Sequence, residues 1–407
     1  MPGGQTRPTE TGGGNPLRTG VFPVSNETLP AWTYDNAEFF ALEIEAIFMR
    51  TWHIVGHVSE LRESGDYLRF DLPGESVFVV RDADGALGAF YNVCRHRASR
   101  LVDGDAGHCG KAIRCRYHGW TYGLDGRLKS VPAEKSFPGL DKASIRLAAV
   151  EHEVWFGFVF IRFEPGGASV AEVMAPYAEE LAAYRFEDLE PIGRYWGSTA
   201  PVDWKNAVDN NIEGYHIPLG HPGLQRLFGP NYGFETQPHG IARAGGRLFD
   251  KPTPNWSERH YLKLLPEVDH LPAERRRAWH YYSLFPNAAF DVYPDTIDFF
   301  QMIPAGPGRC RLRGRAYGVP DTRREMRAAR YLNGRINRLV GQEDVALVAG
   351  VQAGLASRSY DVGLLSDKEQ RIREFHSLIR ALIPVSRSPT APEPGSVARR
   401  NREMAAG

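Results

Sequence analysis

Two short stretches of the chain each place a cysteine close to a histidine. YNVCRHR carries Cys94 and His96, and CRYHGWTY carries Cys115 and His118, with residues 97–114 between the two pairs. Both pairs follow strand-like segments and enter turns, so they can meet at one end of a small β-domain. Two thiolates and two imidazoles can bind a structural zinc ion or a [2Fe–2S] cluster. One Cys and one His from each loop favour the cluster, because zinc fingers usually pair Cys with Cys and His with His.

The 4 cysteines in this chain are too few to predict a disulfide framework. Cys109 stands beside His108 in the glycine-rich segment GDAGHCGK, between the two loops. We expect these two residues to form a surface turn, because they lie outside the spacing of the paired loops. Among the cysteines, we therefore expect Cys94 and Cys115 to bind a metal.

A second group of potential metal ligands occurs in the stretch WKNAVDNNIEGYHIPLGH. Its apolar spacing predicts a helix that carries Glu213 and His216 on one face, since residues i and i+3 are neighbours on a helix. Pro218 and Gly220 predict that this helix ends before His221, which can then return toward the same metal from the following loop. Two histidines and one carboxylate with open coordination positions are typical of non-haem Fe(II) oxygenases.

The third ligand of such a site must be a carboxylate from elsewhere in the chain. In GQEDVALVAGVQAGL the apolar residues recur at helical spacing from Asp344, which places Asp344 on the apolar face of its helix. A buried carboxylate is costly unless it is paired or bound to metal. Asp344 is the predicted ligand, although a buried pair with an arginine is an open alternative. The weaker candidates are Glu343, which we expect to reach solvent, Asp209 and Asp361.

The surrounding elements divide the chain into two folded domains. An amphipathic helical pattern at 36–50 precedes short alternating runs, including EVWFGFVFIRF, which predict a small all-β domain. VAEVMAPYAEELAAY, aromatic-rich strand candidates at 279–318 and long helical patterns at 322–356 and 366–382 predict a mixed α+β domain. The predicted boundaries are a flexible tail at 1–35, the first domain at 36–165, the second domain at 166–384 and a flexible tail at 385–407.

Composition excludes several classes of function. Lys+Arg 49 balances Asp+Glu 49, so the chain lacks the positive surface that nucleic-acid binding requires. No apolar run reaches membrane-spanning length. The N-terminal sequence has no apolar region of a secretory signal, which predicts a cytoplasmic protein.

The motif C-x-H … C-x-x-H-G-W resembles the cluster-binding motif of Rieske proteins, although the gap between the two loops is slightly long. E-x-Y-H-x4-H, followed by E-D-x-x-L-x-x-x-V-Q-x-G-L, is similar to the catalytic half of Rieske oxygenase large (alpha) subunits, the aromatic ring-hydroxylating family. The resemblance spans roughly residues 36–380. It implies a Rieske [2Fe–2S] domain followed by a catalytic domain of antiparallel sheet and helices, of the helix-grip, START-like type.

The resemblance also implies a role for each residue singled out above. In the family, a carboxylate three residues before the first iron histidine links that histidine to a cluster histidine of the neighbouring subunit, within a homotrimer. That place is held here by Glu213, where many ring-dihydroxylating members have Asp. Glutamate there resembles members that oxidise trimethylammonium compounds such as glycine betaine or carnitine. The implied ligands are Cys94, His96, Cys115 and His118 for the [2Fe–2S] cluster, and His216, His221 and Asp344 for the mononuclear iron.

The implied reaction uses O2 and electrons from NAD(P)H. The chain has no convincing dinucleotide fingerprint, because its GGG lies in the N-terminal tail rather than in a strand–turn–helix unit. A separate reductase or ferredoxin is therefore expected as the electron donor, and a small beta subunit remains possible.

Three functions are compatible with these residues. The first is hydroxylation or dihydroxylation of a small aromatic compound in a catabolic pathway. The second is oxidative removal of an N- or O-alkyl group from a quaternary ammonium or N-methyl compound. The third is a Rieske electron carrier without catalysis, which Asp344 and the paired histidines disfavour.

The substrate contacts are the least determined part of the sequence. In WHYYSLFPNAAFDVYPDTIDFFQM a strand would direct Trp279 and Tyr281 to one face, and His280 and Tyr282 to the other. One set could surround a flat ring or a quaternary ammonium group, whereas sheet core is the expectation for most of these residues. Two arginines are candidates for contact with a substrate carboxylate: Arg243 and Arg247.

Overall fold

The structure, a computed structural model, describes residues 24–406. The first half of this part of the chain consists of small antiparallel sheets. Central strand β3 is buried on both faces: Val77 and Val79 enter the core shared with the second half, while Phe78 and Val80 enter the core beneath the two Cys–His loops. The strands of these sheets are β1 His53–His57, β2 Asp66–Leu72, β3 Glu75–Arg81, β4 Leu87–Tyr91, β5 Ala106–His108, β6 Ile113–Arg114, β7 Thr121–Tyr122, β8 Leu128–Ser130, β9 Glu151–Trp155 and β10 Phe158–Arg162.

The second half is built on a 7-stranded antiparallel sheet of order β11-β17-β16-β15-β14-β13-β12. Side chains alternate between its faces, so that in β16 Ile297 and Phe299 pack into a core while Asp298 and Phe300 face a cavity on the other side. The strands are β11 Glu190–Ala200, β12 Gly233–Gln237, β13 Ile241–Arg247, β14 Ala278–Leu284, β15 Ala288–Val292, β16 Ile297–Gly306 and β17 Arg309–Gly318.

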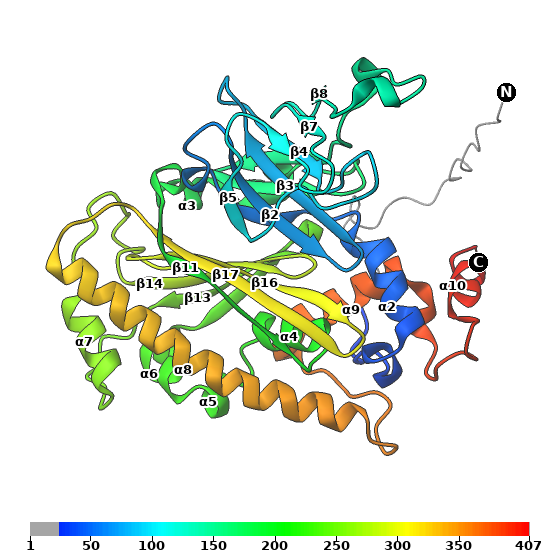
Figure 1. The fold of residues 1–407 in the computed structure, drawn as a ribbon. Coiled ribbons are helices and arrows are strands. Elements are labelled where there is room, and N and C mark those ends of the chain that lie inside the picture. Colours follow the sequence, from blue (N-terminus) through cyan, green and yellow to red (C-terminus); the bar gives the residue numbers. More distant parts are fainter. Residues whose placement is uncertain (1–23, 407) are drawn as a thin grey trace.

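Helices cover the cavity side of this sheet. Figure 1 shows the long helix α8 running beside the sheet, and α4 contacts α8, β16 and β17. The predicted α+β class, with a β-rich first domain and a sheet-and-helix second domain, is confirmed. The helices are α2 Ala37–Glu43, followed by a π-helical turn Ile44–Phe48, α3 Val170–Ala182, α4 Trp204–Ile212, α5 Ile217–Gly220, α6 Pro222–Phe228, α7 Trp256–Leu264, α8 Arg324–Leu355, α9 Gln370–Leu382 and α10 Val397–Ala406.

The apolar run EVWFGFVFIRF forms two strands rather than the one that was predicted. β9 and β10 pair as an antiparallel hairpin, and the chain reverses at Phe156 and Gly157, which both have positive φ. A Cβ on Gly157 would meet Nε2 of buried His57 at 2.1 Å, so only glycine fits this turn. The continuous apolar composition concealed the turn because β10 is buried along its whole length.

The prediction of a flexible C-terminal tail is wrong for residues 385–406. Helix α10 packs against α2, and Val397 is fully buried. Glu38 of α2 accepts hydrogen bonds from the N–H groups of Gly395 (2.6 Å) and Val397 (3.2 Å), which fixes the start of α10. The polar composition of the segment hid a helix whose anchors include buried Val397, partly buried Met404 and the cap from Glu38.

Residues 24–35 also belong to the fold, although the sequence predicted a tail over 1–35. Leu29 is buried, and its N–H donates to Nδ1 of His376 at 3.1 Å. Residues 1–23 of the predicted tail lie outside the described part of the chain. In that described part, no helix has the length and apolar character needed to cross a membrane.

Candidate active site

The loops after β4 and β6 bring Cys94, His96, Cys115 and His118 together. Both thiols are buried in one apolar cluster, and the two imidazole rings lie 4.7 Å apart between centroids. The second loop turns at Gly119 (φ 73°), whose N–H donates to the Cys115 carbonyl at 3.0 Å. Two loops that are far apart in sequence thus present two thiols and two imidazoles side by side.

These residues fit an iron–sulfur cluster. Nδ1 of His118 is buried and has no hydrogen-bond partner, which is costly unless the nitrogen binds a metal. Although burial acts to raise the pKa of the Cys115 thiol, the backbone N–H groups of Tyr117 and His118 contribute to a net lowering. Stabilised thiolate is the form that binds iron.

Two aromatic residues support these ligands. Trp120 stacks on His96, with ring centroids 4.9 Å apart and planes 5° from parallel. The Tyr122 hydroxyl lies 3.3 Å from Sγ of Cys94 and accepts a hydrogen bond from the N–H of Arg95 at 3.0 Å. Sequence reasoning quoted both aromatics in CRYHGWTY but assigned them no role, because their contacts cross between loops.

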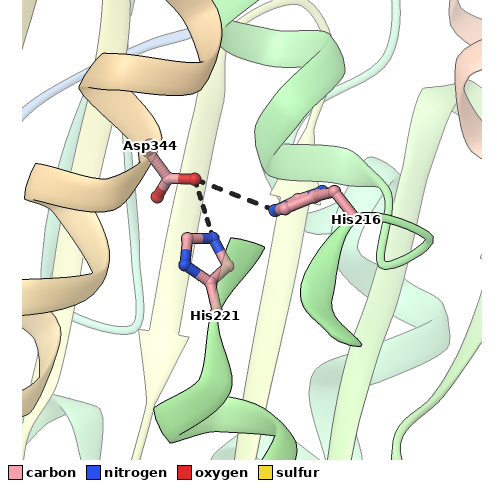
Figure 2. A group of neighbouring side chains, drawn as sticks. All are labelled: His216, His221 and Asp344. Carbon is pink, nitrogen blue, oxygen red and sulfur yellow. Dashed lines mark hydrogen bonds and ion pairs between the residues drawn. The ribbon is translucent and has the colours of Figure 1, made fainter. Parts of the chain in front are cut away.

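His216, His221 and Asp344 form the second group. Their ligand atoms all lie within 4.8 Å of one another. Oδ1 of Asp344 is 2.8 Å from Nε2 of His221 and 3.8 Å from Nε2 of His216, and Figure 2 shows the three side chains pointing toward one another. A facial set of two imidazoles and one carboxylate suits Fe(II) with open positions.

The helix predicted to carry both Glu213 and His216 ends earlier than expected. Helix α4 stops at Ile212, and Glu213 is extended (φ −117°, ψ 164°). The Glu213 carboxylate nevertheless contacts Nδ1 of His216 and accepts from the backbone N–H of Tyr215, so it orients the imidazole from outside the helix. His221 directly follows the short helix α5, as predicted for a residue beyond a helix end, but Pro218 lies in the first turn of α5 rather than ending a helix.

Glu343 was predicted to reach solvent, and its side chain is 39% exposed, but it also makes a contact that the sequence did not predict. Its Oε2 lies 2.8 Å from Nδ1 of His221, so the ring is held between Glu343 on one nitrogen and Asp344 on the other. Although burial acts to lower the pKa of His221, these two carboxylates raise it overall. Of these two adjacent residues on α8, Asp344 is the candidate metal ligand and Glu343 orients the imidazole.

The two other carboxylates that the sequence suggested as ligands do not pair with His216 or His221. Asp209 pairs with His376 at 3.0 Å, and the backbone of Asp361 receives the N–H of Ala31. The apolar stripe below Asp344 is also less buried than predicted, because Val351 is 54% exposed. Asp344 instead faces the cavity described next.

A cavity of about 300 Å³ opens beside the metal-ligand candidates. It lies between the sheet and helices α4 and α8, and its lining is mostly apolar. His216, His221 and Asp344 form part of its wall. A small organic molecule that occupies the cavity can therefore contact the group.

The aromatic residues predicted near the substrate divide between cavity and core. Tyr281 lines the cavity, whereas Trp279 is fully buried against Tyr261 and Tyr293. His280 lies beside Arg275.

Several other residues that the sequence suggested for a functional role also lie away from the cavity. Tyr282 donates to Glu180. Arg243 pairs with Glu180 and Glu235. Neither Arg243 nor Arg247 is among the described lining residues, so the predicted carboxylate contact is not formed in this cavity. His108 pairs with Asp66 at 2.9 Å on a strand edge, and the Cys109 thiol donates to the Gly65 carbonyl.

Both halves of the chain match known protein families. Residues 51–147 match the Rieske [2Fe-2S] domain, and residues 186–384 match the ring hydroxylating alpha subunit (catalytic domain). The carnitine monooxygenase oxygenase subunit of Acinetobacter pittii is 30% identical over 84% of this chain and 90% of its own length. The chain belongs to the Rieske oxygenase alpha subunits.

Other relatives of this Rieske oxygenase include the chloroplastic choline monooxygenase of Spinacia oleracea, which is 28% identical over 87% of this chain and 78% of its own length. A quaternary ammonium Rieske monooxygenase solved in complex with L-carnitine superposes with a TM-score of 0.72 at 26% identity, covering 88% of this chain and 96% of that one. The fold is shared with naphthalene 1,2-dioxygenase from Rhodococcus sp. That structure superposes with a TM-score of 0.71 at 20% identity, covering 87% of this chain and 94% of that one. The cofactors of this oxygenase are a Rieske [2Fe–2S] cluster and mononuclear non-haem iron.

Proposed function

We propose that this Rieske oxygenase oxidatively removes an N-alkyl group, most simply a methyl group, from a quaternary ammonium compound. The observation that carries the proposal is the group of His216, His221 and Asp344 in the wall of a small, mostly apolar cavity. The similarity to monooxygenases named for carnitine and choline supports a quaternary ammonium substrate rather than the aromatic substrate that the sequence suggested first. A non-catalytic electron carrier would have no use for such a cavity.

In this proposal His216, His221 and Asp344 hold the mononuclear iron, and Glu213 and Glu343 orient the two imidazoles from their Nδ1 sides. The iron supplies the activation of O2 once it is reduced. The largely apolar walls exclude water, which limits loss of oxidising equivalents to solvent. The protein thus contributes ligand geometry and placement of the substrate carbon.

The reaction balances with one O2 and two electrons. One oxygen atom enters a C–H bond of the N-methyl group, and the other leaves as water with two electrons from NAD(P)H and two protons. The C–N bond then breaks with its electron pair going to nitrogen, which gives a tertiary amine. Loss of the hydroxyl proton releases the carbon as formaldehyde.

Electrons require a separate donor in this proposal. A reductase, with or without a ferredoxin, would pass them from NAD(P)H to a cluster held by Cys94, His96, Cys115 and His118. Neutral imidazole ligands raise the potential of such a cluster relative to an all-thiolate one, which suits a relay. The buried thiols and the unpartnered Nδ1 of His118 support this ligand set.

A homotrimer is also part of the proposal, with the cluster of one subunit serving the iron of the next. Tyr215, which lies between Glu213 and His216, is 55% exposed, and Leu219, just after them, is 92% exposed. Exposed apolar side chains beside a functional group are typical of an interface. Glu213 would connect His216 to the partner subunit's His118 across it.

The test is a single-turnover assay of the holoprotein. Chemically reduced protein is mixed with a panel of quaternary ammonium compounds and aromatic acids, O2 is admitted, and products are read by mass spectrometry. Formation of a tertiary amine with a matching amount of aldehyde is the expected result. A hydroxylated or dihydroxylated aromatic ring as the product would overturn the proposal.

A further inference from the structure

Two carboxylates lie next to each other on the floor of the iron cavity. Asp291 of β15 and Asp298 of β16 are directly paired in the sheet, and Tyr281 of β14 is paired with Asp291 on its other side. All three residues line the same cavity as His216 and Asp344. None of the functions assigned above uses the two aspartates.

The two aspartates are poorly satisfied within the protein. Oδ1 of each is buried and has no hydrogen-bond partner in the described chain. Among residues 24–406, the one side-chain hydrogen bond to the pair comes from the Tyr293 hydroxyl, which donates to Oδ2 of Asp291 at 3.2 Å. Burial raises the pKa of both carboxyls, that of Asp298 to about 7. Carboxylates are costly to bury without a compensating charge, so they point to a ligand that brings a positive charge into the cavity.

The rest of the cavity limits the charge of that ligand. Its described lining includes neither lysine nor arginine, while acidic side chains are present on both the sheet and the helix side. Aromatic rings of Tyr281, Tyr232 and Trp196 complete the wall, and their faces attract cations. A ligand carboxylate would meet acidic and apolar groups there, with no positive side chain to pair with.

We propose that Asp291 and Asp298, together with Tyr281, bind the charged nitrogen of an organic monocation, and that the cavity discriminates against zwitterions that carry a carboxylate. The inference rests on the proposed function and narrows its substrate class to alkylammonium compounds without an acid group. A quaternary nitrogen has no N–H to donate, so Coulombic attraction and the aromatic face carry the recognition.

The test compares ligands of similar size and shape that differ in charge. Anaerobic titration calorimetry of the holoprotein measures Kd for choline, for its uncharged isostere 3,3-dimethylbutan-1-ol and for the zwitterion glycine betaine. We expect choline to bind most tightly. The double variant Asp291→Asn/Asp298→Asn should weaken the binding of choline by roughly 10- to 100-fold. The binding of the neutral isostere should not change. Retained isostere binding and cluster absorbance show that the variant is folded, and the single variant Asp298→Asn serves if the double variant is not.

Asp321→Asn is the control, because Asp321 is a carboxyl that follows β17 of the same sheet, pairs with Arg323 and does not line this cavity. Its choline affinity should equal that of the unmodified protein. Equal affinity for glycine betaine and choline, unchanged choline affinity in the aspartate variants, or no binding of choline overturns the inference. The proposed function is tested separately, by whether the C–N bond of the substrate is cleaved. If the double variant dealkylates its substrate with an unchanged KM, the inference about the aspartates is wrong and the proposed function stands. If the protein binds cations selectively but cleaves no C–N bond, the proposed function is wrong and the inference stands.

Discussion

The Glu343 carboxylate lies 2.8 Å from Nδ1 of His221, on the opposite side of the ring from Asp344. A hydrogen bond to this nitrogen fixes the tautomer that leaves Nε2 free to bind a metal, and it makes the imidazole a stronger ligand. Consecutive residues of one helix therefore act on the two nitrogens of one histidine. The arrangement gives Glu343 a role in iron retention without direct coordination.

Glu343→Ala should weaken Fe(II) retention by roughly 10- to 100-fold, the usual effect of losing such an orienting group. Glu343→Gln keeps an acceptor without the charge and should fall between that variant and the unmodified protein. Iron content after anaerobic dialysis provides the measurement. Glu325→Ala, on the first turn of the same helix, is the control and should retain its iron. Full iron retention in Glu343→Ala would refute the role.

Asp344→Ala should abolish turnover and lose the mononuclear iron, because two imidazoles alone form an incomplete facial site. The visible absorbance of the [2Fe–2S] cluster should remain, since its candidate ligands lie on other loops. Metal analysis and spectroscopy of one preparation check both outcomes. Full activity in this variant would show that Asp344 is not the third ligand.

Local spacing was enough to predict much of this site from the sequence. Cys94 and His96, or His216 and His221, lie within one short segment each, so their types and intervals indicate shared metals. Asp344 was singled out across more than a hundred residues because it lies on an apolar helical stripe, although that stripe is partly exposed and Asp344 faces the cavity instead. The sheet-and-helix class followed from the apolar periodicities.

Contacts that depend on the relative placement of two elements were not predictable in this way. Glu343 points at His221 because of where α8 crosses α6, which no interval along the chain encodes. Asp291 and Asp298 become neighbours only through the register of β15 with β16. Helix α10 likewise depends on a cap from Glu38, far away in sequence.

Tyr122→Phe should lower the reduction potential of the cluster. The Tyr122 hydroxyl lies 3.3 Å from Sγ of Cys94, and a hydrogen bond to a cluster sulfur stabilises the more negative, reduced state. Loss of one such bond, worth about 1 kcal/mol, corresponds to roughly 40 mV for a one-electron couple. Protein-film voltammetry measures the shift. A potential equal to that of the unmodified protein would mean that the hydroxyl does not bond the sulfur when the cluster is bound.

Mixed oligomers should reveal whether electrons cross between subunits. Asp344→Ala keeps the cluster but lacks iron, and His118→Ala lacks a cluster ligand but keeps the iron site, so each homo-oligomer should be inactive. Co-expression in equal amounts should restore about one quarter of the turnover, because one junction in four joins a working cluster to a working iron. Activity that stays at zero would indicate transfer within one chain.

The affinity for organic cations should rise with pH through about 7. Burial, followed by the nearby Asp295 charge, raises the pKa of Asp298 to about 7, and burial followed by Asp298 raises that of Asp291, so the two titrate as a pair. Tyr281 and Tyr293, the titratable neighbours on β14 and β15, stay neutral because burial raises their pKa well above the usual value.

Below pH 7 the carboxyl of Asp298 carries a proton that a cation must displace, so choline affinity should fall toward tenfold per pH unit, and above pH 7 it should level off. Calorimetric titrations of the holoprotein between about pH 5.5 and 8.5 follow this dependence. The neutral isostere should bind equally over the range, and Asp298→Asn should flatten the choline curve. A choline curve that is already flat in the unmodified protein would show that the cation does not bind against these carboxylates.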